Sequence, residues 1–534
     1  MIRPFRSLVV AGLAVASFAA HGAQTPAHAP FDLEEATIAD LQQRMASGRE
    51  TARSIADKYL ARIDAVDRSG PSLHSIIETN PDARSIADQL DAERKSGHVR
   101  GPLHGIPVLL KDNIATADHM MTTAGSAALA GGPAPRDAFI VGRLRDAGAV
   151  ILGKTNLSEW ANFRSTHSSS GWSGRGGQTK NPYALDRSPS GSSSGSGAAA
   201  AANLAAIAIG TETDGSIVSP SSNNSLVGIK PTLGLWSRSG IVPIAHSQDT
   251  AGPMARTVAD AATLLGALAA SDPADAATRS SDAKGQHDYT RFLDAAGLKG
   301  ARIGVVRNRL FGYSVAADAI AEQAIADMKE HGATIVDPAN IATLGKFDDS
   351  EFDVLLYEFK ADLNKYLGAL GAAAPVHSLK DAIAFNEAHR DKELPYFGQE
   401  IMLQAEKKGA LTDAKYRAEL ARNHQLSRAL GIDATMQKYS LDALVAPTGS
   451  PAWLIDLVNG DPGAANAAAP SSVTSVAGYP HITVPAGYFR GLPVGISFFG
   501  RAWSEPTLIK LAYAYEQATR HRKPPAFAPT ADLK

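Results

Sequence analysis

The chain has 534 residues, with 52 Lys and Arg against 54 Asp and Glu, so its formal charge at neutral pH is −2. This balance leaves no basic excess for binding nucleic acid, and the 44% of hydrophobic residues is enough for a large globular core. Cysteine is absent, which excludes disulfides, cysteine metal sites, iron–sulfur clusters and every mechanism with a cysteine nucleophile.

Residues 1–23 have the three-part pattern of a secretory signal peptide. Arg3 and Arg6 are basic, residues 7–20 form an apolar run, and Gly22 and Ala23 permit cleavage. The run is short for a bilayer span, although an uncleaved anchor or a buried helix would be the alternatives. We expect residues 1–23 to be removed. Residues 24–534 should then be periplasmic or secreted, without a membrane anchor.

The next part of the chain predicts alternating helices and strands. Apolar spacing of three and four residues predicts helices over 36–47 and 54–65. Short apolar runs bounded by turns then predict strands that are buried on both faces. These runs are 106–111, 149–153, 205–210, 301–306, 443–446, 481–485 and 494–499. The alternation predicts an α/β fold with a mostly parallel or mixed sheet.

The middle of the chain, about 270–440, is richer in charge and in helical pattern, most clearly over 352–367 and 413–430. We expect this region to lie over the sheet as an insertion or cap, and the chain to return to the core at about 440–525. The sequence shows no clean linker and no fixed-period repeat, so one large domain and two domains both remain open.

Three short catalytic or binding motifs occur in the wrong context. Gly148–Thr155 matches a phosphate loop, but its variable positions are apolar and are typical of a strand. Gly191–Gly195 matches the nucleophile elbow of α/β-hydrolases, but a turn-rich loop precedes it, and no local pattern marks His246 or His481 as its partner. Ser281–Lys284 matches S-x-x-K in a loop-like stretch without partner motifs. Paired metal-ligand spacings are also missing, so we expect no metal and no cofactor.

Residues 188–231 are unusual because Ser and Gly gather in two loops around an Ala-rich helix and a short apolar strand. Glycine permits close backbone approach, and clustered N–H groups can bind an anion. A flexible Ser/Gly linker is the alternative, but a linker does not usually enclose a helix, a strand and a second compact turn. These loops are therefore the candidate site.

Several segments of the chain resemble the amidase signature family, over about residues 31–525. The matching segments are 105–113, 153–160, 188–195, 210–217, 228–234, 249–256, 442–447 and 478–495. Residues 211–216, 357–360 and 502–506 most resemble the bacterial peptide amidases of this family. The resemblance implies a single large α/β domain, with a signature core at about 100–260 and a twisted, mixed and largely parallel central sheet covered by helices on both faces.

The resemblance also implies a Ser–cis-Ser–Lys triad, and each position is filled. Ser216 matches the nucleophile, Ser192 the bridging serine with a cis peptide bond, and Lys111 the base. A serine hydroxyl is a weak nucleophile until a neighbouring base takes its proton. Lysine can be that base only when it is neutral, and burial favours the neutral amine.

The family's oxyanion hole corresponds to the backbone of Thr213, Asp214 and Gly215, and one such N–H donor stabilises a transition state by about 3–4 kcal/mol. Ser193 matches the serine that supports the triad by hydrogen bonding. Asp214 stands where the family commonly has glycine, so its carboxylate must point away from the oxyanion.

Three further positions depart from the family pattern. Ser190 and Ser194 stand where the family commonly has glycine, and Val218 where it commonly has arginine. These departures bear on fine geometry and specificity more than on the class of reaction.

The expected function is hydrolysis of amide bonds through an acyl-enzyme, and the resemblance implies peptide C-terminal amides as substrates. Other amidases of the family act on aryl, fatty or other small amides, which is one alternative. A second is a non-catalytic periplasmic binding protein on the same scaffold. The family also includes one component of a tRNA-dependent amidotransferase, and the export signal and neutral charge argue against that role. We expect a small amide or peptide amide as the only partner, no nucleic acid, and a monomer.

Overall fold

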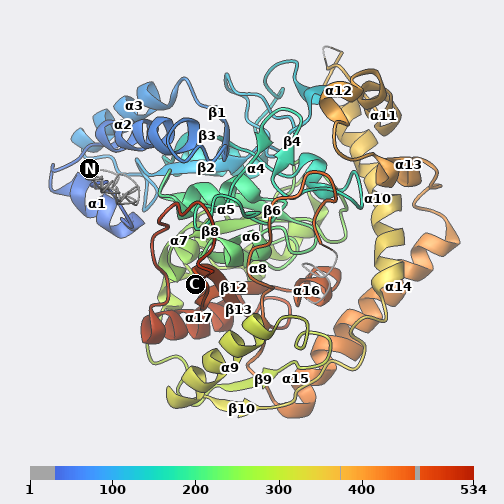
Figure 1. The fold of residues 1–534 in the computed structure, drawn as a ribbon. Coiled ribbons are helices and arrows are strands. Elements are labelled where there is room, and N and C mark those ends of the chain that lie inside the picture. Colours follow the sequence, from blue (N-terminus) through green and yellow to red (C-terminus); the bar gives the residue numbers. More distant parts are fainter. Residues whose placement is uncertain (1–30, 373, 463–468, 534) are drawn as a thin grey trace, which may run out of the picture. The chain divides into compact units, whose positions relative to one another are not determined.

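An eleven-stranded mixed sheet forms the centre of the fold (Figure 1). The structure is a computed structural model that describes residues 31–372, 374–462 and 469–533, so the predicted signal peptide lies outside the described residues. In order across the sheet, the strands are β1 (Ile76–Thr79), β3 (Val150–Thr155), β2 (Pro107–Lys111), β6 (Ile207–Glu212), β8 (Thr250–Ala255), β7 (Val227–Lys230), β12 (His481–Phe489), β13 (Leu492–Phe499), β11 (Ala443–Pro447), β9 (Arg302–Val305) and β10 (Thr334–Val336).

Helices alternate with these strands along the chain. The α-helices are α1 (Ile38–Ala46), α2 (Ala52–Arg62), α3 (Ala83–Lys95), α4 (Phe139–Asp146), α5 (Ser194–Ala201), α6 (Val218–Asn223), α7 (Val258–Leu268), α8 (Ser281–Lys284), α9 (Val315–Glu330), α10 (Asp348–Gly368), α11 (Leu379–Ala388), α12 (Arg390–Glu393), α13 (Glu400–Glu406), α14 (Ala414–Ser427), α15 (Asp433–Tyr439), α16 (Ser471–Ala477) and α17 (Glu505–Thr519). Among the described residues, no helix combines the length and the apolar character needed to cross a membrane.

Shorter elements complete the fold. A two-stranded ribbon joins β4 (Trp172–Ser173) to β5 (Gly177–Gln178). The 3₁₀ and π turns are η1 (Ile63–Arg68), η2 (Ala127–Leu129), η3 (Glu159–Asn162), η4 (Ala276–Ser280), η5 (Thr290–Phe292) and η6 (Arg428–Ile432).

All seven predicted strands are present, and the α/β class is confirmed. Every residue of β2, β3, β6 and β11 is buried. Successive side chains of a strand point to opposite faces, so this burial means that both faces of the sheet are covered. Four strands of the sheet escaped the sequence patterns: β1, β7, β8 and β10. The β8 strand contains Gly252 and Pro253, which are rare inside strands.

The mixed character of the sheet is confirmed. Fewer of its strand pairs are parallel, however, than a largely parallel sheet would contain. Parallel pairs join β3, β2 and β6 on one side and β11, β9 and β10 on the other. The remaining pairs are antiparallel. The β12–β13 hairpin and the unpredicted strands β7 and β8 lie between the two parallel blocks and reverse the chain direction there.

The expected cap region divides into two parts. Residues 302–305 and 334–336 extend the sheet as its strands β9 and β10, while helix α9 between them packs on β11, β12 and β13. Helices α10, α13 and α14 lie along one side of the sheet (Figure 1), and α10 contacts both of the others. Helix α10 buries Leu355, Phe359 and Leu363 in a cluster that includes Trp160 and Phe163 from the signature core.

Helix α5 explains why the Ser/Gly/Ala-rich stretch is folded and is not a linker. All eight of its residues are buried, and none is larger than serine. A side chain at Gly195 would place its Cβ 2.3 Å from the carbonyl oxygen of Ser75 and 2.5 Å from that of Asn156. Small residues are therefore required for the close approach of this helix to its neighbours.

The aromatic contact between Phe359 and Phe163 is expected to stabilise the docking of α10. The two rings meet edge to face with centroids 5.0 Å apart, and Phe359 is 1% exposed. Replacing Phe359 by Ala should lower the free energy of unfolding by about 3–5 kcal/mol, since a large buried side chain is lost. Urea unfolding measures this change. Val315→Ala, at a position 90% exposed, is the control and should leave the midpoint unchanged.

Candidate active site

Lys111 and Ser192 lie in contact at the carboxyl ends of two neighbouring parallel strands. Strands β2 and β6 are neighbours in parallel register, so their carboxyl ends lie together. Lys111 is the last residue of β2, and its Nζ lies 2.8 Å from Ser192 Oγ. The same nitrogen lies 3.2 Å from the carbonyl oxygen and 2.9 Å from Oγ1 of Thr211 on β6. The structure thus brings two of the three predicted triad residues into direct contact.

The three contacts of Lys111 suit both of its protonation states. A charged ammonium has three N–H donors, one for each oxygen. A neutral amine keeps two donors for Thr211, and its lone pair can then accept the proton of the Ser192 hydroxyl. Asn113 Nδ2 also donates to Thr211 Oγ1, at 2.9 Å. Thr211 therefore orients the amine without supplying a charge that would hold it protonated.

Burial lowers the pKa of Lys111 to about 7, because the charged form is taken out of water. The carboxylates of Asp249 and Glu212 oppose this shift but do not cancel it. A large fraction of the amine is therefore neutral near pH 7, which is the state a general base needs.

Ser192 is held at the start of α5. The Gly191–Ser192 peptide bond is cis, as the resemblance implied, and the carbonyl oxygen of Ser192 accepts a hydrogen bond from the Ser158 N–H at 3.0 Å. A Cβ at Gly191 would lie 2.3 Å from Ser158 Oγ, so only glycine fits there.

The two serines that replace family glycines are accommodated by local hydrogen bonds. Ser190 has a φ of 62°, and its Oγ lies 2.8 Å from Ser219 Oγ. Ser194 Oγ donates to the carbonyl oxygen of Ser190 at 2.6 Å. Both extra hydroxyls therefore have hydrogen-bond partners, one of them on α6.

The loop that carries Ser216 is tied to the Ser192 loop. The Ser193 N–H donates to the carbonyl oxygen of Ser216 at 3.3 Å, and Ser216 is 9% exposed. The buried carboxylate of Glu212 accepts the N–H groups of Ile217 at 2.7 Å and Val218 at 3.0 Å. The chain on each side of the nucleophile candidate is therefore anchored.

The backbone of the predicted oxyanion hole can offer N–H groups to a substrate. Within the described residues, the N–H groups of Asp214 and Gly215 donate to no other protein group. The Asp214 side chain is exposed and accepts a hydrogen bond from Ser472 Oγ at 2.7 Å. This is the arrangement expected of a carboxylate that is not aimed at an oxyanion.

Thr213 is braced by two residues that the sequence reasoning did not single out. Its Oγ1 donates to Asp249 Oδ1 at 2.6 Å, and its carbonyl oxygen accepts a hydrogen bond from Gln248 Nε2 at 3.1 Å. Asp249 Oδ2 also accepts the N–H groups of Ile244 and Ala245, each at 2.9 Å. Thr211, Glu212 and Asp249 all lie inside segments that resemble the family. This resemblance was the sequence signal that could have identified them as site residues.

Several residues of the rejected motifs have a structural role. Ser193, the centre of the elbow match, donates to the carbonyl oxygen of Thr211 at 3.0 Å and accepts its N–H at 3.2 Å. His481 is buried and lies 2.6 Å from Ser497 Oγ on the neighbouring strand. Lys154 is buried in β3 and donates to the carbonyl oxygen of Ile114 at 2.7 Å. Residues 281–284, expected as loop, form α8 instead.

A cavity of about 380 Å³ adjoins the site. Asn113, Thr211 and Thr213 connect it to the triad region. Its other walls come from the loop after β7, from the segment after α7, and from α10 with the residues that follow it. They include Arg238, Ile241, Val242, Ile244, His246, Asp249, Asp275, Asp362, Lys365, Tyr366 and Leu370. A volume of this size holds a small ligand, and the mixture of apolar and polar walls suits one with both kinds of group.

Comparison with known proteins identifies the family of the chain. The family model for Amidase matches residues 54–509. A probable amidase of Arabidopsis thaliana is 44% identical over 506 residues, covering 93% of this chain and 92% of that protein. Native peptide amidase from Stenotrophomonas maltophilia is 52% identical with a TM-score of 0.88, covering 93% of this chain and 100% of that one. A putative amidase of Schizosaccharomyces pombe is 37% identical over 533 residues, covering 93% of this chain and 87% of that protein.

The chain therefore belongs to the amidase signature family, as its motifs predicted. It is an amide hydrolase.

The rate of amide hydrolysis should fall at acid pH. Lys111 has a pKa of about 7, and its protonated form cannot accept a proton. Below this pKa, kcat/KM should therefore fall about tenfold per pH unit. Initial rates of ammonia release between pH 5 and 7 measure this limb. A rate that stays constant over this range would contradict a lysine base.

Proposed function

We propose that this amidase removes the C-terminal carboxamide of short peptides, releasing ammonia and leaving a free carboxylic acid. The contact that carries the proposal is the one between the Lys111 amine and the Ser192 hydroxyl, at 2.8 Å in a buried site. The similarity to peptide amidase supports the substrate class: a peptide amidase structure with the competitive inhibitor chymostatin is 52% identical, with a TM-score of 0.89.

In the first half-reaction, Ser216 Oγ attacks the carboxamide carbon. Its proton passes to Ser192 Oγ, while the Ser192 proton passes to Lys111 Nζ. The carbonyl oxygen becomes an oxyanion, which the N–H groups of Thr213, Asp214 and Gly215 would stabilise. Lys111 then returns a proton through Ser192 to the amide nitrogen, the C–N bond breaks, and ammonia leaves.

The second half-reaction is the same proton path with water as the nucleophile. Water gives a proton through Ser192 to Lys111 and attacks the acyl carbon of the ester on Ser216. The proton returns to Ser216 Oγ as the C–O bond breaks, and the acid product leaves. The free enzyme is restored with its amine neutral, so no other proton donor or acceptor is required.

The cavity walls favour a peptide over a fatty acyl chain. Apolar side chains are interrupted by charged or polar ones, including Asn113, Lys365 and Tyr366. A long alkyl chain would desolvate these groups without a hydrogen bond in return, which is unfavourable. Peptide N–H and C=O groups can satisfy them. Aryl and other small amides are the second candidate substrate class, because they would fill only part of the cavity.

We also propose that the mature chain acts outside the cytoplasm as a monomer. The proposal of export rests on the pattern of residues 1–23. We propose a monomer because one chain supplies every residue of the proposed site.

Ser216→Ala should abolish turnover and leave the fold intact. Without the hydroxyl no acyl-enzyme forms, so kcat should fall by about a thousandfold or more. Ammonia release from a C-terminally amidated dipeptide measures the loss, and circular dichroism confirms folding. Ser281→Ala is the matched control, since the hydroxyl of this buried serine donates only to the carbonyl oxygen of Leu235. Full activity in Ser216→Ala would remove Ser216 from the mechanism.

A substrate panel tests the proposed substrate class. Amidated di- and tripeptides should be hydrolysed with kcat/KM at least about tenfold higher than benzamide, acetamide or a fatty amide, because only peptides can satisfy the polar walls. Faster release from a fatty or aryl amide would replace the proposal by the alternative class. Tight peptide binding without ammonia release would favour a binding protein.

A further inference from the structure

Helix α10 holds the loop that leads to Asp249 through three acidic side chains on one face. Glu351, Glu358 and Asp362 are separated by seven and four residues, so they share a face of the helix. They accept hydrogen bonds from three successive residues: Gln248 Nε2 donates to Glu351 at 2.9 Å, the Ser247 N–H to Glu358 at 2.9 Å, and the His246 N–H to Asp362 at 2.9 Å.

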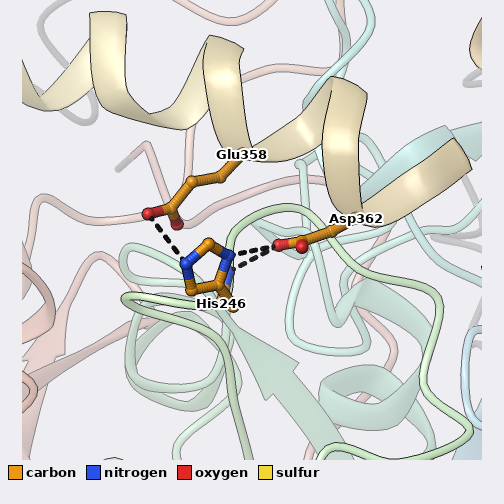
Figure 2. Close-up of side chains that lie close together, drawn as sticks. All are labelled: His246, Glu358 and Asp362. Atoms are coloured by element: carbon orange, nitrogen blue, oxygen red, sulfur yellow. Dashed lines mark hydrogen bonds and ion pairs between the residues drawn. The ribbon is translucent and has the colours of Figure 1, made fainter. Parts of the chain in front are cut away.

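The His246 ring lies between two of these carboxylates (Figure 2). Its Nδ1 is 2.8 Å from Asp362 Oδ2, and its Nε2 is 3.4 Å from Glu358 Oε1. A neutral imidazole has only one N–H, whereas an imidazolium donates from both nitrogens. Only the charged ring can therefore satisfy both carboxylates at once.

These three side chains have the residue types of a metal site, but their arrangement does not favour one. Glu358 and Asp362 flank the ring (Figure 2), and the three ligand atoms lie within 4.8 Å of one another, but both carboxylates are already paired with the ring nitrogens. Each carboxylate also accepts a backbone N–H. The geometry is that of a cation held between two anions.

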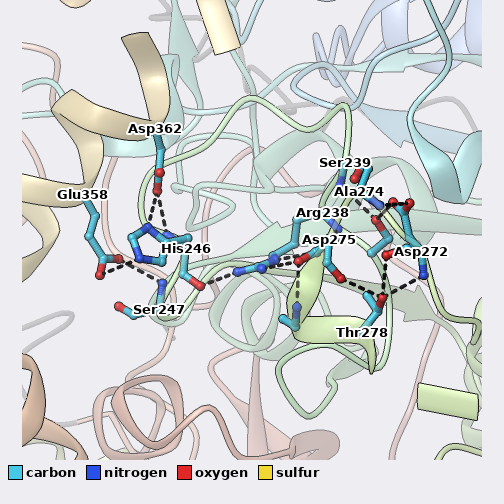
Figure 3. Close-up of polar contacts among 12 residues, drawn as sticks. Arg238, Ser239, His246, Ser247, Asp272, Ala274, Asp275, Thr278, Glu358 and Asp362 are labelled. Atoms are coloured by element: carbon cyan, nitrogen blue, oxygen red, sulfur yellow. Dashed lines mark hydrogen bonds and ion pairs between the residues drawn. The ribbon is translucent and has the colours of Figure 1, made fainter. Parts of the chain in front are cut away.

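His246 also ties the loop to Arg238. The carbonyl oxygen of His246 accepts a hydrogen bond from the Arg238 guanidinium, and Arg238 Nε donates to Asp275 Oδ2 at 2.8 Å (Figure 3). Asp275 in turn accepts the Ala277 N–H at 3.2 Å. His246 is therefore the joint between α10 and the Arg238–Asp275 pair.

The same loop contacts the nucleophile loop. Gln248 and Asp249 brace Thr213, as described above, at 3.1 Å and 2.6 Å. His246, Asp249 and Thr213 also line the cavity. A change in how residues 244–249 dock on α10 would thus reach both the cavity wall and the backbone before Ser216.

We propose that His246 is a positioning residue for the reaction: its imidazolium holds residues 244–249 against α10 and so fixes Thr213 in the nucleophile loop. The inference rests on the proposed function of Ser216. His246 does not touch the reacting atoms; it acts through Asp249 and Gln248.

The charged groups around His246 define the pH range of this clamp. Glu358 and Asp362 face it from α10, Arg238 from its own loop, and the Tyr416 hydroxyl from α14, which donates to Glu358 at 2.7 Å. Asp362 and Glu358 raise the pKa of His246, and they outweigh burial and Arg238. The imidazolium is then present below this raised pKa and is lost as the pH rises through it.

Loss of the imidazolium leaves two carboxylates with one N–H between them. The clamp should therefore loosen toward alkaline pH, while the Lys111 base is lost toward acid pH. Together the two groups predict a bell-shaped dependence of kcat/KM on pH, with His246 setting the alkaline side.

His246→Gln tests the proposal, with His119→Gln as the matched control. His119 is an exposed histidine 2.6 Å from Asp82 and does not line the cavity. In His246→Gln, kcat for an amidated dipeptide should fall about tenfold with a smaller change in KM, since the reacting geometry is displaced. The alkaline decline should disappear, while the acid limb stays. His119→Gln should match the wild type in all three respects.

Hydrogen exchange of the amides of residues 244–247 provides a readout that does not need activity. The amides should exchange faster in His246→Gln than in the wild type at pH 6, after correction for intrinsic rates. If the wild type released no ammonia, the proposed function would fail while exchange still tested the clamp. Unchanged exchange, or faster exchange with unchanged kcat and pH profile, would overturn the positioning role.

Glu358→Gln is a second variant in case His246→Gln does not fold. Glutamine keeps an oxygen for the Ser247 N–H but removes one charge beside the ring, so the pKa of His246 should fall. The alkaline decline should then begin at lower pH than in the wild type. An unchanged alkaline limb would count against the clamp.

Discussion

The burial of one amine organises the site. Lys111 ends β2 with no exposed surface, and the resulting loss of hydration lowers its pKa to about 7. A lysine in water would be protonated at this pH and would be useless as a base. Everything around it keeps the amine dry and oriented without fixing its charge: Thr211 offers neutral oxygens, and Ser192 offers a hydroxyl that can give or take a proton.

This constraint accounts for the composition of the surrounding chain. The Ser192 loop has to approach β2 and β6 closely, and α5, which follows it, is built from Gly, Ala and Ser because larger residues would collide with neighbouring backbone. The carboxylates near the amine, Glu212 and Asp249, are occupied by backbone N–H groups and by Thr213. They hold the nucleophile loop in shape, and their negative charge only partly offsets the effect of burial.

Support for the site extends well beyond the signature core. Helix α10, more than a hundred residues downstream of Ser216, binds residues 246–248 through three acidic side chains. Its apolar face is buried against Trp160 and Phe163 of the core. The helix thus forms one wall of the cavity and also holds the loop that braces Thr213. Substrate binding and the geometry of the reaction therefore both depend on α10.

The sequence by itself determined the α/β class and the seven apolar strands, because buried strands leave local patterns. The candidates Lys111, Ser192 and Ser216 came from its resemblance to the amidase signature family. The tertiary structure decided the rest. Strand β8 breaks the pattern with Gly and Pro, and its place in the sheet depends on partners distant in the chain. The clamp at His246 could not be predicted, because a lone histidine has no local signature and its partners stand over a hundred residues away.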